Sequence, residues 1–197
     1  MTHRVDLAAL GGVDIYLLDQ AMKGRLAAGQ RILDAGCGRG RNLLFLESLG
    51  AEVWGLDQDP AAIEALADGR RQLAVAGVEA TGLPGQHFDA VVCNAVLHFA
   101  RDEAHFDAMV AELFRLLVPG GFFFARLASD IGIENAVTPL GDRRFRLPDR
   151  STRFLVDRAR IIAATARVGA QLVEPIKTVH VDGLRCMTNW CAVKAER

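Results

Sequence analysis

The sequence has few of the features that mark a secreted or metal-binding protein. Its 197 residues include only four cysteines, with no CxxC pair and no nearby histidine that would complete a zinc site. The four are Cys37, Cys93, Cys186 and Cys191. We therefore expect free thiols in a reducing compartment and no metal, with a disulfide between Cys186 and Cys191 as the less favoured alternative.

Long apolar runs are also missing. No stretch approaches the roughly 18 uninterrupted apolar residues that a membrane-spanning helix needs. Near the amino terminus, Asp6, Asp14 and Asp19 interrupt the apolar residues, and no small-residue cleavage site follows a basic start. These absences predict a cytoplasmic protein that has no membrane partner.

The sequence has no excess of charge of either sign. It contains 23 Lys and Arg against 24 Asp and Glu, so its formal net charge is -1. Nucleic-acid-binding proteins carry a basic surface, so we expect no nucleic-acid partner and favour a small-molecule substrate. The hydrophobic content of 51% and the length fit one α/β domain better than two. The oligomeric state stays open.

Two hydrophobic periods alternate through the first two thirds of the chain. Short apolar runs typical of buried parallel strands are followed by segments with apolar residues at helical spacing. Asp102 is a candidate cap for one of these helices, and Pro60 stands at the favoured first-turn position of another. This rhythm predicts a parallel sheet with helices on both faces. The expected strands are 31–34, 52–56, 72–76, 88–94 and 122–127, the last one following the turn Pro119-Gly120-Gly121.

The rhythm changes after residue 127. Residues 129–153 are rich in arginine and show no clear period, and Asp157 is then a candidate cap for another helix. Two extended runs, 171–181 and 185–193, are separated by Asp182-Gly183, a pair that favours a tight hairpin turn. The chain is therefore expected to end as an antiparallel hairpin at the edge of the parallel sheet.

The segment from Asp34 to Asn42 contains the residues most informative about chemistry. It reads Asp-Ala-Gly-Cys-Gly-Arg-Gly-Arg-Asn and lies between the first strand and the first helix of the sheet. Glycines let the backbone turn tightly and approach a ligand, and the N–H groups at the helix start favour a carboxylate. Asp34 adds a negative charge that suits an ammonium and would disfavour a pyrophosphate. A ligand that has both an ammonium and a carboxylate fits this pattern.

Asp57 follows the second strand, at the same edge of the predicted sheet. A carboxylate at this place can accept hydrogen bonds from both hydroxyls of a ribose. The alternative is a turn aspartate before Pro60, a role for which Asp59 is better placed. The two acidic residues and the glycines together favour a nucleoside cofactor that carries an amino-acid group.

From Asp34 through Asp57 to Pro119-Gly120-Gly121, the sequence resembles the class I S-adenosylmethionine-dependent methyltransferases. Residues 40–46 are also similar to the corresponding stretch of tellurite-resistance methyltransferases. The resemblance implies an α/β, Rossmann-like, doubly wound and mostly parallel seven-stranded sheet that ends in an antiparallel hairpin. It implies a single domain over residues 1–197, with a helix in 1–28 that closes over the cofactor and a substrate-side insertion at 129–155.

The resemblance also implies positions for the cofactor, S-adenosylmethionine, and its product, S-adenosylhomocysteine. Asp34, Gly36 and Gly38 would contact the methionine end, Asp57 the ribose, and Gln58 the adenine. Glu79 and Ala80 resemble the pair at the adenine edge, although the family usually has Asp where this chain has Glu79. Asn94 and Ala95 would lie under the transferring methyl group. The full predicted cofactor set is Asp34, Gly36, Cys37, Gly38, Gly40, Asn42, Asp57, Gln58, Glu79, Ala80, Asn94 and Ala95.

Other residues are candidates for the substrate side. His98 is a weak candidate for a general base, because methyl transfer depends more on in-line geometry than on a base. Phe99 and Tyr16 could attract a sulfonium through their ring faces, with core packing as the alternative for both. The opening helix, with Ile15, Leu18, Met22 and Leu26 on one face, could be a lid or simply core. The arginines of 129–153 could bind an anionic substrate or form an ordinary solvated surface: Arg143, Arg144, Arg146, Arg150 and Arg153.

The sequence therefore predicts an S-adenosylmethionine-dependent methyltransferase that acts on a small molecule, with a soft sulfur, selenium or tellurium nucleophile as one candidate acceptor. A non-catalytic S-adenosylmethionine-binding protein is an alternative, because the motifs above concern binding. A nicotinamide-dependent oxidoreductase is disfavoured, because its dinucleotide motif is GxGxxG and this chain has GxGxG.

Overall fold

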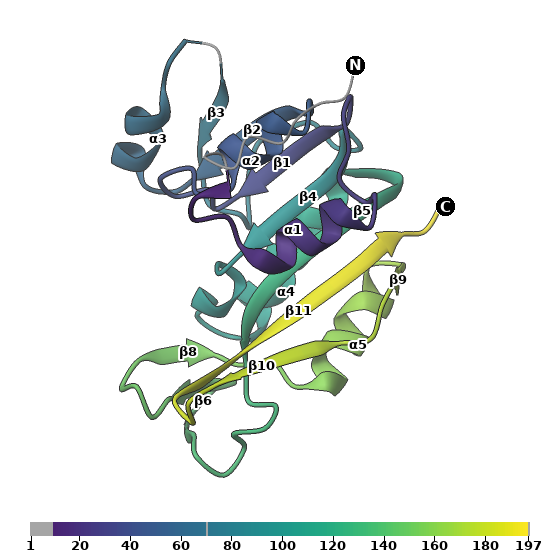
Figure 1. The fold of residues 1–197 in the computed structure, drawn as a ribbon. Helices are drawn as coiled ribbons and strands as arrows, with labels where there is room; N and C mark the ends of the chain where they lie inside the picture. Colours follow the sequence, from purple (N-terminus) through teal and green to yellow (C-terminus); the bar gives the residue numbers. More distant parts are fainter. Residues whose placement is uncertain (1–9, 70, 197) are drawn as a thin grey trace.

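A large, mostly parallel sheet forms the centre of the computed structural model, which describes residues 10–69 and 71–196 (Figure 1). Seven strands lie in the order β10-β11-β5-β4-β1-β2-β3, and the eighth, β9, pairs with β11. The strands β1 to β5 run parallel, whereas β11 is antiparallel to both β5 and β10. The bounds are β1 (Arg31–Ala35), β2 (Glu52–Asp57), β3 (Gln72–Val75), β4 (Phe88–Asn94), β5 (Leu117–Ser129), β9 (Ala170–Leu172), β10 (Lys177–Val181) and β11 (Arg185–Lys194). The predicted fold class is confirmed.

The strand order reverses between β1 and β4. The strand β1 pairs with β2 on one side and with β4 on the other, because the chain crosses over the sheet after β3. Loops that leave the carboxyl ends of two such strands diverge and leave a crevice between them. The glycine-rich segment follows β1, and residues 95–99 follow β4, so both candidate regions lie at this crevice.

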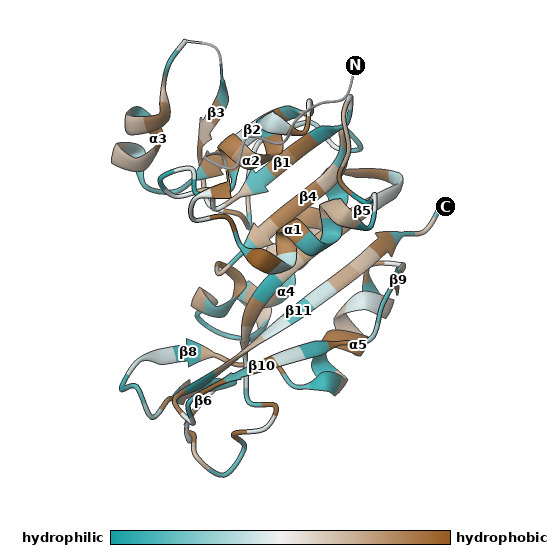
Figure 2. Cartoon of the chain, in the orientation of Figure 1, coloured by the Kyte–Doolittle hydropathy of each residue, from teal (hydrophilic) through white to brown (hydrophobic). Residues whose placement is uncertain are grey.

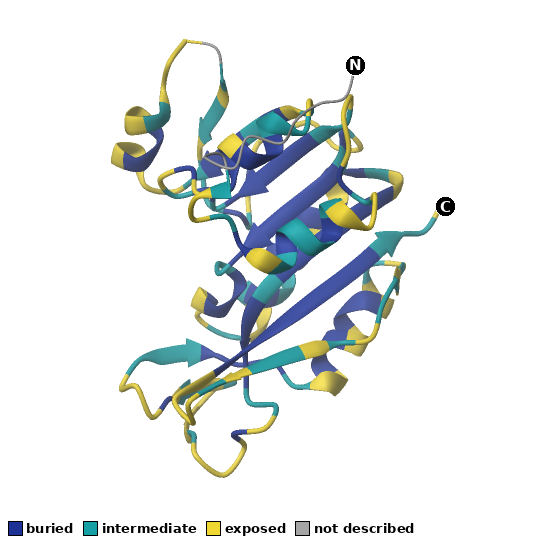
Figure 3. Ribbon diagram, viewed as in Figure 1, coloured by how far each residue is buried: buried dark blue, intermediate teal, exposed yellow. Residues whose placement is uncertain are grey.

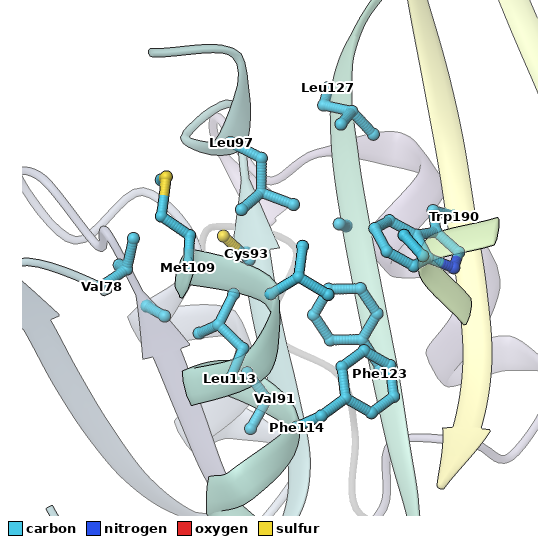
Figure 4. Packing of buried hydrophobic residues seen from close by; sticks show 14 of the residues in the cluster. Val78, Val91, Cys93, Leu97, Met109, Leu113, Phe114, Phe123, Leu127 and Trp190 are labelled. Atoms are coloured by element: carbon cyan, nitrogen blue, oxygen red, sulfur yellow. The ribbon is translucent and has the colours of Figure 1, made fainter. Parts of the chain in front are cut away.

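Helices cover both faces of the sheet. On one face, α1 (Ile15–Met22), α2 (Leu43–Ser48) and α3 (Pro60–Leu66) share a buried apolar cluster with alternate residues of β1, β4 and β5. On the other face, α4 (Glu103–Leu116) and α5 (Arg158–Arg167) pack against the intervening residues. Figure 4 shows Leu113 and Phe114 of α4 facing Val91 and Phe123, with Trp190 of β11 beyond them. This alternation is what a sheet buried on both faces requires.

Hydropathy and burial follow this layering. The central strands β1 and β4 are mostly hydrophobic in Figure 2 and buried in Figure 3, whereas the loops at the lower end are largely exposed. No helix in the described part of the chain is long and apolar enough to cross a membrane.

The helices begin where the sequence predicts caps. The side chain of Asp102 accepts a hydrogen bond from the His105 N–H at 2.7 Å, and Asp157 accepts one from the Arg160 N–H at 2.6 Å. Pro60 occupies the first turn of α3. Each carboxylate satisfies a donor that the first turn of a helix leaves free.

The chain between β5 and α5 contains secondary structure that the sequence does not predict. Three short strands, β6 (Thr138–Gly141), β7 (Arg144–Arg146) and β8 (Thr152–Phe154), form a separate antiparallel sheet. All of β6 is exposed, and both arginines of β7 are exposed, so no apolar alternation marks these strands. The strand β5 also begins at Leu117, before the predicted residue 122, with a register shift near Pro119-Gly120-Gly121.

The predicted apolar face of the opening helix is only partly correct, because Leu26 is buried and Leu18 packs against the core, but Ile15 and Met22 do not. Leu17 is fully buried, whereas the side chains of Ile15 and Met22 are 68% and 81% exposed. The cap residue Asp14 explains this rotation, because its backbone N–H donates to the Asn42 side chain and its carboxylate lies 3.1 Å from the Arg126 guanidinium. These contacts fix the start of the helix, and Leu17 then faces the sheet.

Replacement of Leu17 tests this orientation. We expect Leu17→Ala to lower the free energy of unfolding by about 2–5 kcal/mol, because it leaves a cavity in a packed core. The matched Ile15→Ala change should stay within about 0.5 kcal/mol, because its side chain is exposed. Denaturant titration measures both, and equal losses in the two variants would contradict the orientation.

Candidate active site

The turn after β1 uses its three glycines for different physical reasons. All three have positive φ angles: +79° at Gly36, +53° at Gly38 and +80° at Gly40. A Cβ atom on Gly36 would lie 2.2 Å from a methyl group of Val96, and one on Gly40 would lie 2.6 Å from Leu66. A Cβ on Gly38 would meet nothing within 4 Å. Gly36 and Gly40 therefore allow close packing, and Gly38 leaves an open approach to the backbone.

Backbone hydrogen bonds join this turn to the end of β2. The N–H groups of Gly36 and Cys37 both donate to the Leu56 carbonyl, at 2.7 and 2.9 Å. The Asp57 carboxylate accepts from the Gly38 N–H at 2.8 Å and from the Asp59 N–H at 3.0 Å. An ionised carboxylate has about four acceptor positions. Asp57 therefore keeps acceptor capacity for a ligand while it holds the turn in place.

A cavity of about 410 Å³ opens at this edge of the sheet, which we call the first cavity. It is lined by five of the predicted cofactor residues, which come from the ends of β1, β2 and β4 and from the loop after β3. They are Gly36, Asp57, Gln58, Glu79 and Ala95. The predicted residues thus gather at one place, although they are spread over sixty positions of the sequence.

The sequence does not identify the far wall of the first cavity. Val96, Arg101, His105 and Met109 line it from the loop after β4 and from α4. His105 Nδ1 accepts from the Arg101 N–H at 3.1 Å, and its Nε2 lies 3.5 Å from Glu79 Oε1. The two side chains are close, but His105 Nε2 forms no hydrogen bond with any described residue. No local pattern signals these residues, because only the packing of α4 against the sheet brings them to the cavity.

The side chains of Asp34 and Asn94 are buried polar groups whose hydrogen bonds to the described residues are incomplete. Asp34 Oδ2 and both polar side-chain atoms of Asn94 are buried and have no hydrogen-bond partner in the described structure. Burial raises the pKa of Asp34 to about 7, with a further increase from Asp57 that Arg41 opposes. Buried polar atoms are rarely left unpaired. The free polar atoms of these two residues would suit a ligand at the strand ends, although neither residue lines the first cavity.

The other seven predicted cofactor residues do not line the cavity: Asp34, Cys37, Gly38, Gly40, Asn42, Ala80 and Asn94. Cys37 is buried in the apolar cluster under α1 and α2, and burial raises its thiol pKa to about 12. The Asn42 side chain accepts the Asp14 N–H at 3.3 Å, so it fastens α1 to the turn. Ala80 is exposed and lies outside the cavity lining. The structure therefore gives Cys37 and Asn42 packing and anchoring contacts.

A second cavity of about 250 Å³ adjoins the first, and Ala95 lines both. His98 lines the second cavity, and its Nδ1 accepts the Ala128 N–H at 3.3 Å. Burial, with a contribution from Arg153, lowers its pKa to about 4, so the ring is neutral at pH 7. A neutral ring that accepts at Nδ1 carries its proton on Nε2. His98 is therefore a donor in this geometry, which disfavours a role as general base.

The two aromatic candidates, Phe99 and Tyr16, have different positions in the structure. Phe99 lines the first cavity, is 58% exposed and has the Arg153 guanidinium 5.0 Å from its ring centre. Tyr16 packs against Arg126 at 5.1 Å and lines neither cavity. Phe99 therefore remains a candidate site residue, whereas the contact with Arg126 accounts for the position of the Tyr16 ring.

The five candidate arginines of residues 129–153 also differ in whether they line a cavity. Only Arg153 lines the second cavity, whereas Arg143 pairs with Asp157 at 2.7 Å. Arg144, Arg146 and Arg150 are exposed and lie outside the lining. Three other arginines, which the sequence does not single out, take their place: Arg41, Arg126 and Arg185.

Comparison with known proteins shows what this arrangement is related to. Residues 33–125 match a family described as methyltransferase domain. A malonyl-[acyl-carrier protein] O-methyltransferase from Enterobacter lignolyticus (strain SCF1) is 38% identical over 118 residues, which cover 56% of this chain and 45% of that protein. Residues 33–125 of the chain are therefore similar to the S-adenosylmethionine-dependent methyltransferases. It spans about half the length of the curated relatives it matches.

Two solved structures of methyltransferases have the same fold as this chain. An S-adenosylmethionine-dependent methyltransferase from Methanosarcina mazei aligns with a TM-score of 0.74 at 19% identity. The alignment covers 90% of this chain and 98% of the other. A 1,6-didemethyltoxoflavin-N1-methyltransferase from Burkholderia thailandensis, solved with bound 1,6-didemethyltoxoflavin and S-adenosylhomocysteine, aligns with a TM-score of 0.71 at 20% identity. That alignment covers 96% of this chain and 80% of the other.

S-adenosylmethionine is the cofactor of methyltransferases to which this chain is similar, and the described residues fit it. Gly38 leaves its approach open, the buried Asp34 carboxylate lacks a partner at one oxygen, and Asp57 can accept further hydrogen bonds. These features suit an ammonium and a ribose. The narrower resemblance to tellurite-resistance methyltransferases stays a prediction.

The raised pKa of Asp34 gives a stability test. The folded protein binds its proton more tightly than the unfolded chain does, so this group favours folding below about pH 4 and that contribution is lost as pH rises through 7. We expect Asp34→Asn to increase the free energy of unfolding at pH 8, on the order of 1–3 kcal/mol. The gain should vanish near pH 4, as urea titrations at both pH values would show. An equal effect at both would contradict a buried ionising carboxylate.

Proposed function

We propose that this protein transfers a methyl group from S-adenosylmethionine to a small-molecule acceptor. The observation that carries the proposal is the pair of adjoining cavities at the carboxyl edge of the sheet, which meet at Ala95. The first lies beside the glycine turn and Asp57, and the second is small, at about 250 Å³. The family and the O-methyltransferase named above support a methyl transfer reaction.

The residues have distinct roles in this proposal. Asp57 would bind the ribose, Gln58 and Glu79 the adenine, and Gly38 and Asp34 the methionine end. When bound, S-adenosylmethionine supplies an electrophilic methyl group on a sulfonium sulfur, which becomes a neutral thioether as the methyl leaves. Ala95 and Val96 would shape the passage between the two cavities, since Ala95 lines both and Val96 packs on Gly36.

Catalysis would come chiefly from position. The chain brings donor and acceptor into adjoining spaces, so that the reacting atoms meet in line without a large entropic cost at the moment of reaction. His98 donates through Nε2 in this geometry, so an acceptor that is already nucleophilic at neutral pH suits the site better than one that needs a base.

Some finer expectations remain proposals. Residues 129–155 are proposed as the substrate-side insertion, supported by Ser151 and Arg153 in the second cavity. A helix in 1–28 is proposed as a lid, although Leu17 shows that α1 packs as core, and residues 1–9 lie outside the described chain. The whole chain as one domain, a cytoplasmic location and a soft sulfur, selenium or tellurium acceptor also stay predictions. The related families favour neither a non-catalytic binding protein nor an oxidoreductase.

Calorimetric titration with S-adenosylhomocysteine tests the cofactor site directly. We expect wild-type protein to bind, and Asp57→Asn to weaken binding by about tenfold or more, because one acceptor of a charged hydrogen bond is lost. The matched control is Asp59→Asn, only two residues away, whose side chain caps α3 by accepting from the Ala61 N–H. Asparagine is also a good cap, so this control should retain both its stability and its affinity.

Two results would overturn the proposal. One is a folded wild-type protein that binds neither S-adenosylmethionine nor S-adenosylhomocysteine. The other is equal affinity in wild type, Asp57→Asn and Asp59→Asn, which would place the cofactor elsewhere. If the protein binds S-adenosylmethionine but forms no S-adenosylhomocysteine with any of a broad set of acceptors, the non-catalytic alternative is favoured.

A further inference from the structure

The second cavity is strongly cationic. Four arginines line it: Arg41, Arg126, Arg153 and Arg185. They come from the glycine turn, β5, β8 and β11, so four separate elements converge on one small space. Like charges repel when they are brought together, and a folded chain gathers them chiefly where a ligand of opposite charge compensates.

The carboxylates around the cavity compensate only part of this charge. Asp149 also lines it, 4.0 Å from the Arg185 guanidinium, and its carboxylate accepts from the N–H and hydroxyl of Ser151. Asp14 lies 3.1 Å from Arg126 and 3.9 Å from Arg41. Four positive charges thus face two negative ones, which leaves a formal excess of two.

Two of the arginines retain unused capacity to donate. Arg153 has no described carboxylate oxygen within 4.0 Å of its guanidinium, although the charge of Asp149 interacts with it at longer range. Its guanidinium donates to the Thr152 carbonyl at 2.8 Å and lies over the Phe99 ring. Arg126 Nε is buried and has no hydrogen-bond partner among the described residues. Guanidinium groups offer paired N–H donors that match the two oxygens of a carboxylate or phosphate.

The other residues that line the second cavity also suit the binding of an anion and a methyl-transfer reaction. His98 presents its Nε2 as a donor, because its Nδ1 accepts the Ala128 N–H. The boundary with the first cavity is formed by Ala95, whose φ of +63° is unusual for a residue with a side chain. Strained backbone of this kind persists where surrounding contacts hold it and is common at functional sites. The Ala95 N–H donates to the Arg126 carbonyl at 2.8 Å, which ties the boundary to the arginine cluster.

We propose that the methyl acceptor is a small organic anion whose carboxylate or phosphate group is bound by Arg153 and Arg185, with Arg126 and His98 as further donors. This inference rests on the proposed function and adds the substrate class to it. The arginines differ from those expected from the sequence, because Arg41, Arg126 and Arg185 lie outside residues 129–153. Uncharged acceptors would leave the excess positive charge unpaired.

Anion binding can be measured separately from cofactor binding. Protein saturated with S-adenosylhomocysteine is titrated calorimetrically with succinate, citrate and inorganic phosphate at constant ionic strength, with succinamide as the uncharged counterpart of succinate. We expect at least one of the anions to bind and succinamide not to bind. A preference for the two carboxylates or for phosphate then identifies the oxyanion.

Matched substitutions test the location. Arg153→Gln and Arg185→Gln should each weaken binding of the best anion by about tenfold to a hundredfold, the effect of losing a charge-assisted hydrogen bond. Arg146→Gln removes the same charge from an exposed position on the neighbouring strand β7 and should change affinity less than twofold. All three variants should bind S-adenosylhomocysteine as wild type does, which shows that they are folded.

The proposal is overturned if no anion binds better than succinamide while S-adenosylhomocysteine binds normally. It is also overturned if Arg146→Gln weakens anion binding as much as Arg153→Gln and Arg185→Gln do. Failure of the proposed function has a different signature, because wild-type protein would then not bind S-adenosylhomocysteine at all.

Discussion

The hydrogen bond from the Gly38 N–H to the Asp57 carboxylate is the interaction on which the site depends. It joins the turn after β1 to the end of β2 and fixes the open side of Gly38 beside an acceptor with spare capacity. The backbone hydrogen bonds from the N–H groups of Gly36 and Cys37 to the Leu56 carbonyl also fix this turn. One carboxylate thus supports the local backbone and remains available to a ligand, so its environment serves both stability and binding.

The two cavities differ in the physics of their walls. The first combines backbone and acidic acceptors, as suits hydroxyl and ammonium donors. The second combines guanidinium groups with a histidine donor, as suits an anion. Ala95 separates them at the point where the strand order reverses, and the geometry of the sheet therefore brings two opposite kinds of recognition into contact.

Stability and binding conflict at Asp34. Its burial disfavours the charged form, which a cationic ligand would need, and one of its oxygens has no hydrogen-bond partner in the described part of the chain. A comparable conflict exists among the arginines of the second cavity, whose mutual repulsion is only partly offset by Asp14 and Asp149. Proteins commonly retain such locally unfavourable groups at functional sites, because the ligand supplies the missing compensation.

The grouping of Gly36, Asp57, Gln58, Glu79 and Ala95 was implied by the resemblance to methyltransferases. The sequence by itself determined the parallel sheet, its terminal hairpin and the helix caps. These depend on local signals: apolar period, capping carboxylates, and glycines that permit positive φ. Only the tertiary structure decided which face of α1 is buried, that Asn42 anchors Asp14, and that His105 approaches Glu79. It alone also brought Arg41, Arg126 and Arg185 to Arg153, because their convergence depends on how distant elements pack and no sequence period records such packing.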